Sequence, residues 1–283
     1  MLGYLQFVAV WSCAKRVTPF AIVATLCAGS KPCWSQGKLP PVPVDDPRTE
    51  PLVTDRPDFT ESALTIPPGL SQAEFGSTIT RNSGDKESAF GEMLLRIGVS
   101  PRAELRLGLP TYLTTRRPGT GRDSGFSDAS LGAKFSLARA REGFGLRQYD
   151  VGLIIGSTLL TGSSAYRGKH LQPSVKLLLA SALNKTVSLS ANLNYDLVSD
   201  DQGRYGEASS SVSAGFAAAE RVGIYAEYFG FYPSGSGRKN ANYVNTGITY
   251  LVSNNLQLDT RVGKGLNGVR NDYFVGAGAS RRF

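Results

Sequence analysis

From residue 71 to the last residue, apolar and polar side chains alternate in short runs separated by polar or glycine-rich stretches. A period of two is the pattern of a β-strand with two different faces. About twelve runs follow one another, each near the roughly 9–11 residues with which a tilted strand crosses a bilayer. The runs are 71–81, 88–100, 103–115, 126–139, 149–162, 171–183, 186–199, 205–219, 221–233, 241–253, 255–267 and 272–283.

The connections between these runs alternate in length. One set is mostly tight, at 101–102, 184–185, 220 and 254. The other set is longer and polar, at 82–87, 116–125, 163–170, 200–204, 234–240 and 268–271. Short periplasmic turns and longer outer loops are typical of an all-β transmembrane antiparallel up-and-down β-barrel, whereas a soluble β-sandwich has no reason for this parity. Residues 141–148 break the rule, because they are long where a tight turn is expected.

The last run ends on the aromatic Phe283 at the final residue. In an outer-membrane barrel the last strand must pair with the first, and a terminal aromatic residue suits the bilayer interface. Counting the connections puts Phe283 at the periplasmic end. We therefore predict that 272–283 closes the barrel against 71–81, and that Tyr273 and Phe283 form the signal for the barrel-assembly machinery. Taken alone, the run also fits an edge strand of a soluble sheet.

Charged residues recur on one face of the runs. Leu105, Leu107 and Leu109, for example, alternate with Glu104 and Arg106. Unpaired charges are costly in hydrocarbon, so this face must meet water or other charges. The residues predicted to line the lumen and set selectivity are Glu92, Arg96, Glu104, Arg106, Asp128, Lys134, Lys176, Asp196, Glu227, Asp259 and Arg261. Both signs occur, which leaves two interpretations: a narrow wet passage or a plug of salt-bridged side chains.

The first 70 residues differ from the rest. Lys15 and Arg16 precede an apolar stretch, which predicts a Sec-type signal peptide over 1–35. All 3 cysteines of the chain lie in this stretch, so the remaining chain offers no disulfide and no thiolate.

A proline-rich segment over 36–70 precedes the predicted barrel of 71–283. Prolines this dense exclude a helix or a central strand. The segment is either a periplasmic lead-in or an insert into the lumen, and Asp55, Arg56 and Asp58 could pair with inward-facing charges. As a hypothesis, it folds into the periplasmic mouth and narrows the passage.

Two stretches carry a resemblance to a known family. LVTDRPDFTESALTIPPG (52–69) and GKGLN…NDYFVGAGASRRF (263–283) resemble the opening and the close of the outer-membrane β-barrel transporter family labelled as the MetA pathway of phenol degradation. The resemblance implies an outer-membrane barrel that passes small, aromatic compounds. Arg281 departs from the family, which commonly has a hydrophobic or aromatic residue there.

Motifs add little catalytic chemistry. GKGLNG (263–268) matches the dinucleotide pattern G-x-G-x-x-G, but it joins two predicted strands instead of a strand and a helix. His170, the only histidine, shares a loop with Ser163 and Ser164, which keeps an outer-membrane lipid hydrolase as the least favoured alternative. One histidine without cysteines falls short of a zinc site. We expect no enzyme activity, no catalytic residue, no cofactor and no metal.

Basic residues gather in the longer connections, among them Arg116, Arg117 and Arg122. They favour either attraction of anionic solutes to the outer mouth or contact with the phosphates of lipopolysaccharide. The net charge of +8 is spread over loops without a nucleic-acid motif, so no nucleic-acid partner is expected.

Together the patterns predict a passive channel for small, aromatic or anionic solutes in the outer membrane of a Gram-negative cell. A non-conducting structural or surface-interaction barrel is the second interpretation. The expected partners are outer-membrane lipid and lipopolysaccharide, the barrel-assembly machinery and a small-molecule solute.

Overall fold

The computed structural model describes residues 46–283 except 83, 120, 141–142, 201–202, 236, 268 and 270–271. The predicted signal peptide over 1–35 lies outside these residues. A short 3-10 helix, η1 (Pro47–Thr49), precedes the strands. The strands are β1 Ser71–Asn82, β2 Asp85–Ser100, β3 Ala103–Leu109, β4 Tyr112–Arg117, β5 Gly121–Phe126, β6 Ser130–Ala138, β7 Asp150–Thr158, β8 Gln172–Ala182, β9 Val187–Asp200, β10 Gly203–Ala219, β11 Val222–Pro233, β12 Ala241–Ser253, β13 Leu256–Gly265 and β14 Tyr273–Arg282.

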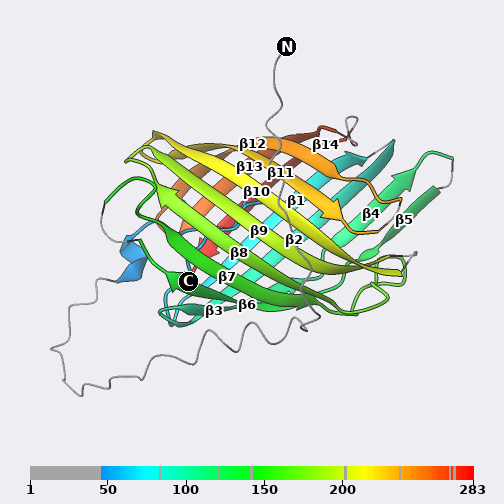
Figure 1. Ribbon diagram of the computed structural model, residues 1–283, viewed down its shortest axis with the longest axis horizontal. Helices are drawn as coiled ribbons and strands as arrows, with labels where there is room; N and C mark the ends of the chain where they lie inside the picture. The colour runs from blue at the N-terminus through cyan, green and yellow to red at the C-terminus, as the bar shows by residue number, and fades with distance from the viewer. Residues whose placement is uncertain are drawn as a thin grey trace, which may run out of the picture. The chain divides into compact units, whose positions relative to one another are not determined.

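The sheet closes on itself. Every pairing is antiparallel, and β1 pairs with both β2 and β14, as Figure 1 lets the reader follow around the wall. The register places Gln72 opposite Arg282 and Arg81 opposite Tyr273. Phe283 N also donates to Ser71 O at 2.8 Å. The predicted closure of the last run against the first is confirmed, and so is the antiparallel barrel.

Two wall strands are each broken into two pieces. β3 and β4 follow one another along β2, while β6 pairs with β3 and β5 pairs with β4. The first break falls at Pro110, which has no N–H for the ladder. The second faces it, because Thr111 N donates to Ser127 Oγ at 2.9 Å and Ser127 N donates to Thr111 O at 2.9 Å. Counted as one strand each, the broken strands bring the barrel to the predicted twelve.

Two connections between strands differ from the simple pattern of short turns and long loops. The predicted outer loop over 116–125 is wrong, because β4 and β5 pair through this stretch as a hairpin up to Arg117 and Gly121. The connection after β6 is long, as the sequence indicates for residues 141–148. It folds back on the end of β8, where Gly145 N donates to Ala182 O at 2.9 Å and Ser181 Oγ donates to Gln148 O at 2.8 Å.

The two faces of the wall differ in character. Along β9, Leu193 and Tyr195 are more than half exposed, whereas Asn192 and Asn194 are buried. The same holds along β3, where Glu104 is buried and Leu105 is exposed. The buried interior is therefore polar and the exposed face apolar, which is the reverse of a soluble protein. In the described part of the chain, no helix is long and apolar enough to cross a membrane.

Candidate functional site

The chain before β1 enters the barrel interior at the end where Phe283 lies. Arg282 donates from Nη2 to Glu50 O at 2.6 Å, and Leu52 N donates to Asn254 O at 2.7 Å. In Figure 1 η1 lies at the same end of the barrel as the C-terminus. Residues 52–66, which we call the lumen segment, then make contacts with inward-facing residues of the strands.

The carboxyl of Asp55 is the centre of the first contact. Lys134 Nζ donates to its two oxygens at 2.9 and 2.8 Å, and Arg106 Nη1 donates to Oδ2 at 2.5 Å. Arg96 Nη1 lies 3.5 Å from the same oxygen. Burial alone would raise the pKa of the Asp55 carboxyl, but the three cations outweigh burial and hold that pKa well below its ordinary value. Asp55 is therefore a charged anchor.

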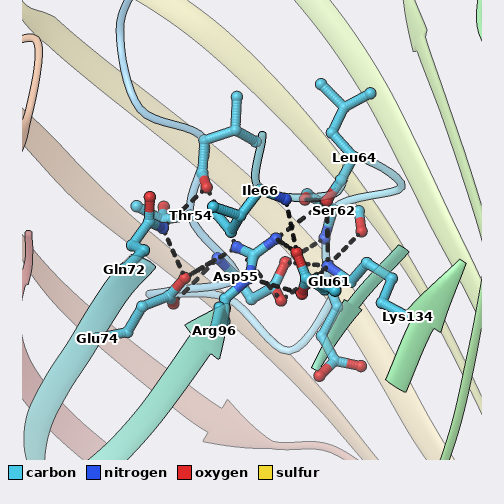
Figure 2. A network of polar contacts seen from close by, with 12 residues as sticks. Thr54, Asp55, Glu61, Ser62, Leu64, Ile66, Gln72, Glu74, Arg96 and Lys134 are labelled. Carbon is cyan, nitrogen blue, oxygen red and sulfur yellow. Dashed lines mark hydrogen bonds and ion pairs between the residues drawn. The ribbon is translucent and has the colours of Figure 1, made fainter. Parts of the chain in front are cut away.

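Arg96 of β2 links the lumen segment to β1 and β3. Figure 2 shows Arg96 between Glu74 and the part of the segment that contains Leu64. Its Nε donates to Glu104 Oε1 at 2.8 Å and its Nη1 donates to Glu74 Oε1 at 2.9 Å. Its Nη2 donates to the backbone oxygen of Leu64 at 3.0 Å. Glu104 in turn accepts from Ile66 N at 2.7 Å. The strand charges thus satisfy backbone groups of the segment, which a buried loop requires.

The charges of this cluster balance. Arg106 Nη2 and Lys176 Nζ each lie 2.9 Å from the carboxylate of Glu61. Paired and hydrogen-bonded charges are the only kind that a protein interior tolerates without a large desolvation cost. The carboxylates are Asp55, Glu61, Glu74 and Glu104, and the cations are Arg96, Arg106, Lys134 and Lys176.

A second contact surrounds Arg56. Its guanidinium lies 3.2 Å from Asp259 Oδ1 and 3.4 Å from Glu92 Oε2. Gly76 and Gly278 face each other across β1 and β14 at this point. A Cβ on either glycine would collide with the guanidinium, so the two glycines open the space that Arg56 occupies.

A third contact reaches β10 and β11. Glu227 accepts from Phe59 N at 2.9 Å and from Thr60 N at 2.7 Å, and Thr60 Oγ1 lies 2.7 Å from Ser211 Oγ. The Phe59 ring stacks on Phe229 with centroids 4.8 Å apart and meets Phe231 edge-on at 5.3 Å. This contact is aromatic and neutral apart from Glu227.

Asp58 is the acidic residue of the lumen segment that lacks a cationic partner within the described residues. Burial, and then the nearby charge of Glu227, raise its pKa to about 8. Asp58 therefore carries its proton at neutral pH, in contrast to Asp55 three residues earlier.

Cavities lie on both sides of the lumen segment. One of about 570 Å³ is lined by Arg56, Asp58 and Phe59 together with wall residues nearer the outer end, such as Asp128 and Thr158. One of about 520 Å³ is lined by Thr54, Arg56 and Asp58 together with Asn184 and Arg221 at the end predicted to be periplasmic. Arg56–Asp58 borders both, so the segment stands between two open spaces of solute size.

The residues predicted to line the lumen fall into four groups. Arg96, Glu104, Arg106 and Lys134 are buried in the ion-pair cluster. Lys176 lies at the partly exposed edge of this cluster, where it pairs with Glu61, and Glu92, Glu227, Asp259 and Arg261 contact the lumen segment at its other points. Asp196 lines the outer cavity. Asp128 has a local role, because its carboxylate accepts from Gly162 N and Gly168 N at 2.7 Å each and so holds the β7–β8 connection.

Sequence reasoning missed the aromatic residues Phe229, Phe231, Tyr243 and Phe274. Phe229 and Tyr243 stack at 5.0 Å inside the barrel, although a polar interior predicts no such ring cluster. The available signal was their position: Phe229 and Phe231 continue the inward face of Glu227.

The predicted assembly residues lie on the outward face. Tyr273 and Phe283 are about half exposed, and the Arg281 guanidinium lies 5.3 Å from the Phe283 ring centroid. Their role as an assembly signal stays a prediction.

In the connection between β7 and β8, which contains His170, Ser163 makes a structural hydrogen bond. Ser163 Oγ accepts from Phe126 N at 2.8 Å, while His170 is exposed. Within the described residues no group of three or more His, Cys, Asp or Glu side chains is placed to hold a metal ion.

A closed barrel with an apolar outer face and a charged interior is the architecture of outer-membrane channel proteins. The model of the family described as "Putative MetA-pathway of phenol degradation" matches residues 54–283, and the chain belongs to that family. The resemblance seen in the sequence is thereby confirmed.

Solved structures agree on the fold. The COG4313 outer membrane channel from Pseudomonas putida F1 is 16% identical, with a TM-score of 0.56 over 78% of this chain and 98% of that chain. The NanC porin is 11% identical, with a TM-score of 0.52 over 74% of this chain and 98% of that chain. No curated protein matches the chain.

Proposed function

We propose that the protein is an outer-membrane channel for small solutes in which the lumen segment controls passage. The observation that carries this proposal is the pair of cavities that share Arg56–Asp58 as a common border. A solute moving between them must pass the segment. The barrel itself is held by its backbone ladder, so the segment can shift without opening the wall.

The proposed solutes are small aromatic acids. The rings of Phe59, Phe229 and Phe231 offer a surface on which a planar ring can stack. Arg261 borders the outer cavity, and its buried Nε has no hydrogen-bond partner among the described residues. A carboxylate is the group that a guanidinium binds best. The label of the family, which refers to phenol degradation, is consistent with aromatic compounds.

The proposed setting follows from the fold. The outward apolar face requires lipid, and the closing strand would be the part that the barrel-assembly machinery contacts. We expect export through the N-terminal signal peptide and no catalytic activity.

A disulfide between the segment and the wall tests the proposal. Thr60 and Ser211 touch through their hydroxyls, and the chain has no cysteine beyond Cys33. In a background with Cys13, Cys27 and Cys33 changed to serine, the double variant Thr60→Cys/Ser211→Cys is oxidised, and its single-channel conductance is compared before and after reduction. The single variant Thr60→Cys is the control. We expect low conductance when oxidised and recovery on reduction. Equal conductance in both states would exclude control by the segment.

A non-conducting barrel is the second candidate, favoured by the balanced ion pairs that hold the lumen segment. It predicts no uptake of aromatic acids or sugars in a liposome-swelling assay, with or without the disulfide. Deletion of residues 37–69 then separates the two candidates. A channel gains conductance on deletion, whereas a filled structural barrel loses stability and shows no selectivity for any solute.

A further inference from the structure

Four basic residues form a row across four neighbouring strands at the outer end of the barrel. Arg81 of β1 lies opposite Lys86 of β2, and Lys86 lies opposite Arg116 of β4. Arg116 in turn lies opposite Arg122 of β5. All four side chains are exposed. Neighbouring strands lie about 4.8 Å apart, so this cationic row extends over roughly 14 Å.

The cationic row lies on the outward face of the wall. Ile79, two residues before Arg81 on the same face, is an exposed apolar residue. The other face of the β4–β5 hairpin is covered, because Tyr166 Oη donates to Thr115 Oγ1 at 3.0 Å. A Cβ on Gly125 would lie 2.7 Å from Ser163 Cβ. The outer loop thus packs inside the hairpin, and the cationic row is left open.

The cationic row has no anionic partner in the described part of the chain. Among the described residues, no carboxylate forms an ion pair with any of its four members. Of the acids nearby, Asp85 and Asp123 pair with Arg117 instead. Glu87 points to the opposite face of the strand from Lys86 and lies opposite Thr115. Like charges opposite one another on neighbouring strands repel. Four in succession therefore call for an anion from outside the chain.

Two further rows lie on the same face closer to the middle of the barrel. The hydroxyl row is Ser88, Thr114 and Ser124, and the aromatic row is Phe90, Tyr112 and Phe126. The aromatic side chains are exposed, and the rings of Tyr112 and Phe126 meet edge-on at 5.3 Å. A cavity of about 690 Å³ runs along this face and is lined by Lys86, Phe90, Thr114, Arg116 and Arg122.

The spacing of the rows matches the layers of a membrane surface. Exposed aromatic girdles of barrels lie at the edge of the hydrocarbon. Four residues separate Phe90 from Lys86, or roughly 13 Å along the strand and roughly 10 Å in height at the usual tilt. The headgroup layer is roughly 5–7 Å thick on each side, so the backbone of the cationic row lies roughly 3–5 Å beyond its outer edge. Long arginine and lysine side chains can reach back over this distance.

We propose that this face binds a phosphorylated glycolipid of the outer leaflet. Its phosphates lie on the cationic row and its acyl chains pack over the aromatic row. Its sugar hydroxyls meet Thr114 and Ser124 of the hydroxyl row, since Ser88 is buried. Arginine suits this role because its guanidinium binds a phosphate through two parallel hydrogen bonds. A free phosphate would gain nothing from the aromatic row, so the anion is carried by a lipid. The site faces away from the lumen and does not depend on conduction.

Binding of fluorescent diphosphorylated lipid A to the detergent-purified full chain tests the proposal. The variant R81Q/K86Q/R116Q/R122Q is compared with R167Q/R204Q/K239Q/K264Q, which removes the same charge from other outer positions. We expect at least a tenfold loss of affinity in the first variant and a change below twofold in the second. Heat-modifiable migration on a gel shows that each variant is folded. If the first variant does not fold, Arg116→Gln alone replaces it, with an expected loss of about threefold.

Two ligand controls complete the test. Dephosphorylated lipid A is expected to bind the wild type at least tenfold more weakly, and inorganic pyrophosphate is expected to compete only at far higher concentration. Equal binding by the cationic-row variant and the wild type would overturn the proposal. So would equal binding of phosphorylated and dephosphorylated lipid. Competition by pyrophosphate at the concentration of the lipid would assign the cationic row to free phosphate and refute the lipid site.

Discussion

The two sides of the barrel interior hold the lumen segment in different ways. On the side of β2, β3 and β6, Arg96, Glu104 and Lys134 are fully buried and ion-paired. On the side of β9, β10 and β11, the buried polar residues are mainly amides and hydroxyls, Asn192, Asn194, Ser209, Ser211 and Ser213. There the segment contributes the ring of Phe59 and two backbone N–H groups.

The difference indicates which part of the lumen segment can move. A buried ion pair is costly to break, because each freed charge stays in a medium of low dielectric constant. A ring contact and hydrogen bonds to neutral groups cost less to exchange for water. The second side also borders the cavities of about 520 and 250 Å³. We therefore expect Asp55 to stay in place while Phe59 and Thr60 move.

The largest expected effect comes from breaking the charged side. Arg96→Met leaves the buried carboxylate of Glu74 without its ion pair and removes one of the cations that pair with Glu104. The free energy of unfolding should therefore fall by about 3–5 kcal/mol. Lys176→Met is the matched control, because Lys176 is partly exposed and pairs with Glu61 alone; its cost should stay below about 1 kcal/mol.

Unfolding of both variants is followed by the circular dichroism of the β-sheet in denaturant. Tryptophan fluorescence is unsuitable, because both tryptophans precede residue 46. Similar losses for Arg96→Met and Lys176→Met would contradict the distinction between the two sides.

Much of the fold follows from the sequence because strand alternation and turn length are local properties. The parity of the connections gave the closure of β14 on β1 before any contact was known. The interruption at Pro110 was missed, although proline lacks the N–H that a central strand needs. The β4–β5 hairpin was missed because its glycines and charges look like a loop, while its pairing depends on the neighbouring β2.

The candidate site was only partly predictable. Inward-facing charges such as Arg96 and Lys134 follow from alternation along one strand. The position of their shared partner Asp55 does not, because Asp55 lies outside the strands. The path of the lumen segment that carries Asp55 depends on the whole interior. Glycines gave an unused signal: Gly98 lies where a Cβ would collide with the backbone oxygens of Ile66 and Pro67. An inward-facing glycine in a strand can thus mark the close approach of another chain segment.

A smaller effect is expected from weakening the neutral side. Phe59→Ala removes the ring contacts with Phe229 and Phe231, each worth about 0.5–1.5 kcal/mol. A loss of roughly 1.4 kcal/mol shifts an equilibrium tenfold. We expect the open probability of single channels to rise about tenfold, with the unfolding midpoint nearly unchanged. Phe144→Ala, in the exposed connection after β6, is the control. A lower unfolding midpoint without a change in gating would assign Phe59 a structural role only.

The smallest expected effect is a dependence of gating on pH, carried by Asp58. Its pKa inside the barrel, about 8, is above that of an aspartate in water, so docking of the segment is strongest when the pH is below both values. Docking then weakens as the pH rises toward 8, because an undocked Asp58 ionises in water while burial and the charge of Glu227 oppose its ionisation in the docked segment. The other groups that face this site are Ser213, which is a hydrogen-bond partner of Asp58, and Arg261, which donates to Pro57 O.

Asp55 stays ionised throughout this range, since its pKa is lowered, and so it does not contribute to the pH dependence of docking. Because Asp58 retains some contact with solvent, we expect open probability to rise only roughly two- to threefold between pH 5 and pH 8.5. Single-channel recordings of Asp58→Asn, which cannot ionise, should show a flat profile over the same range. A variant that kept the slope of the wild type would assign the pH dependence to another group and leave the neutral side of the segment without a titrating residue.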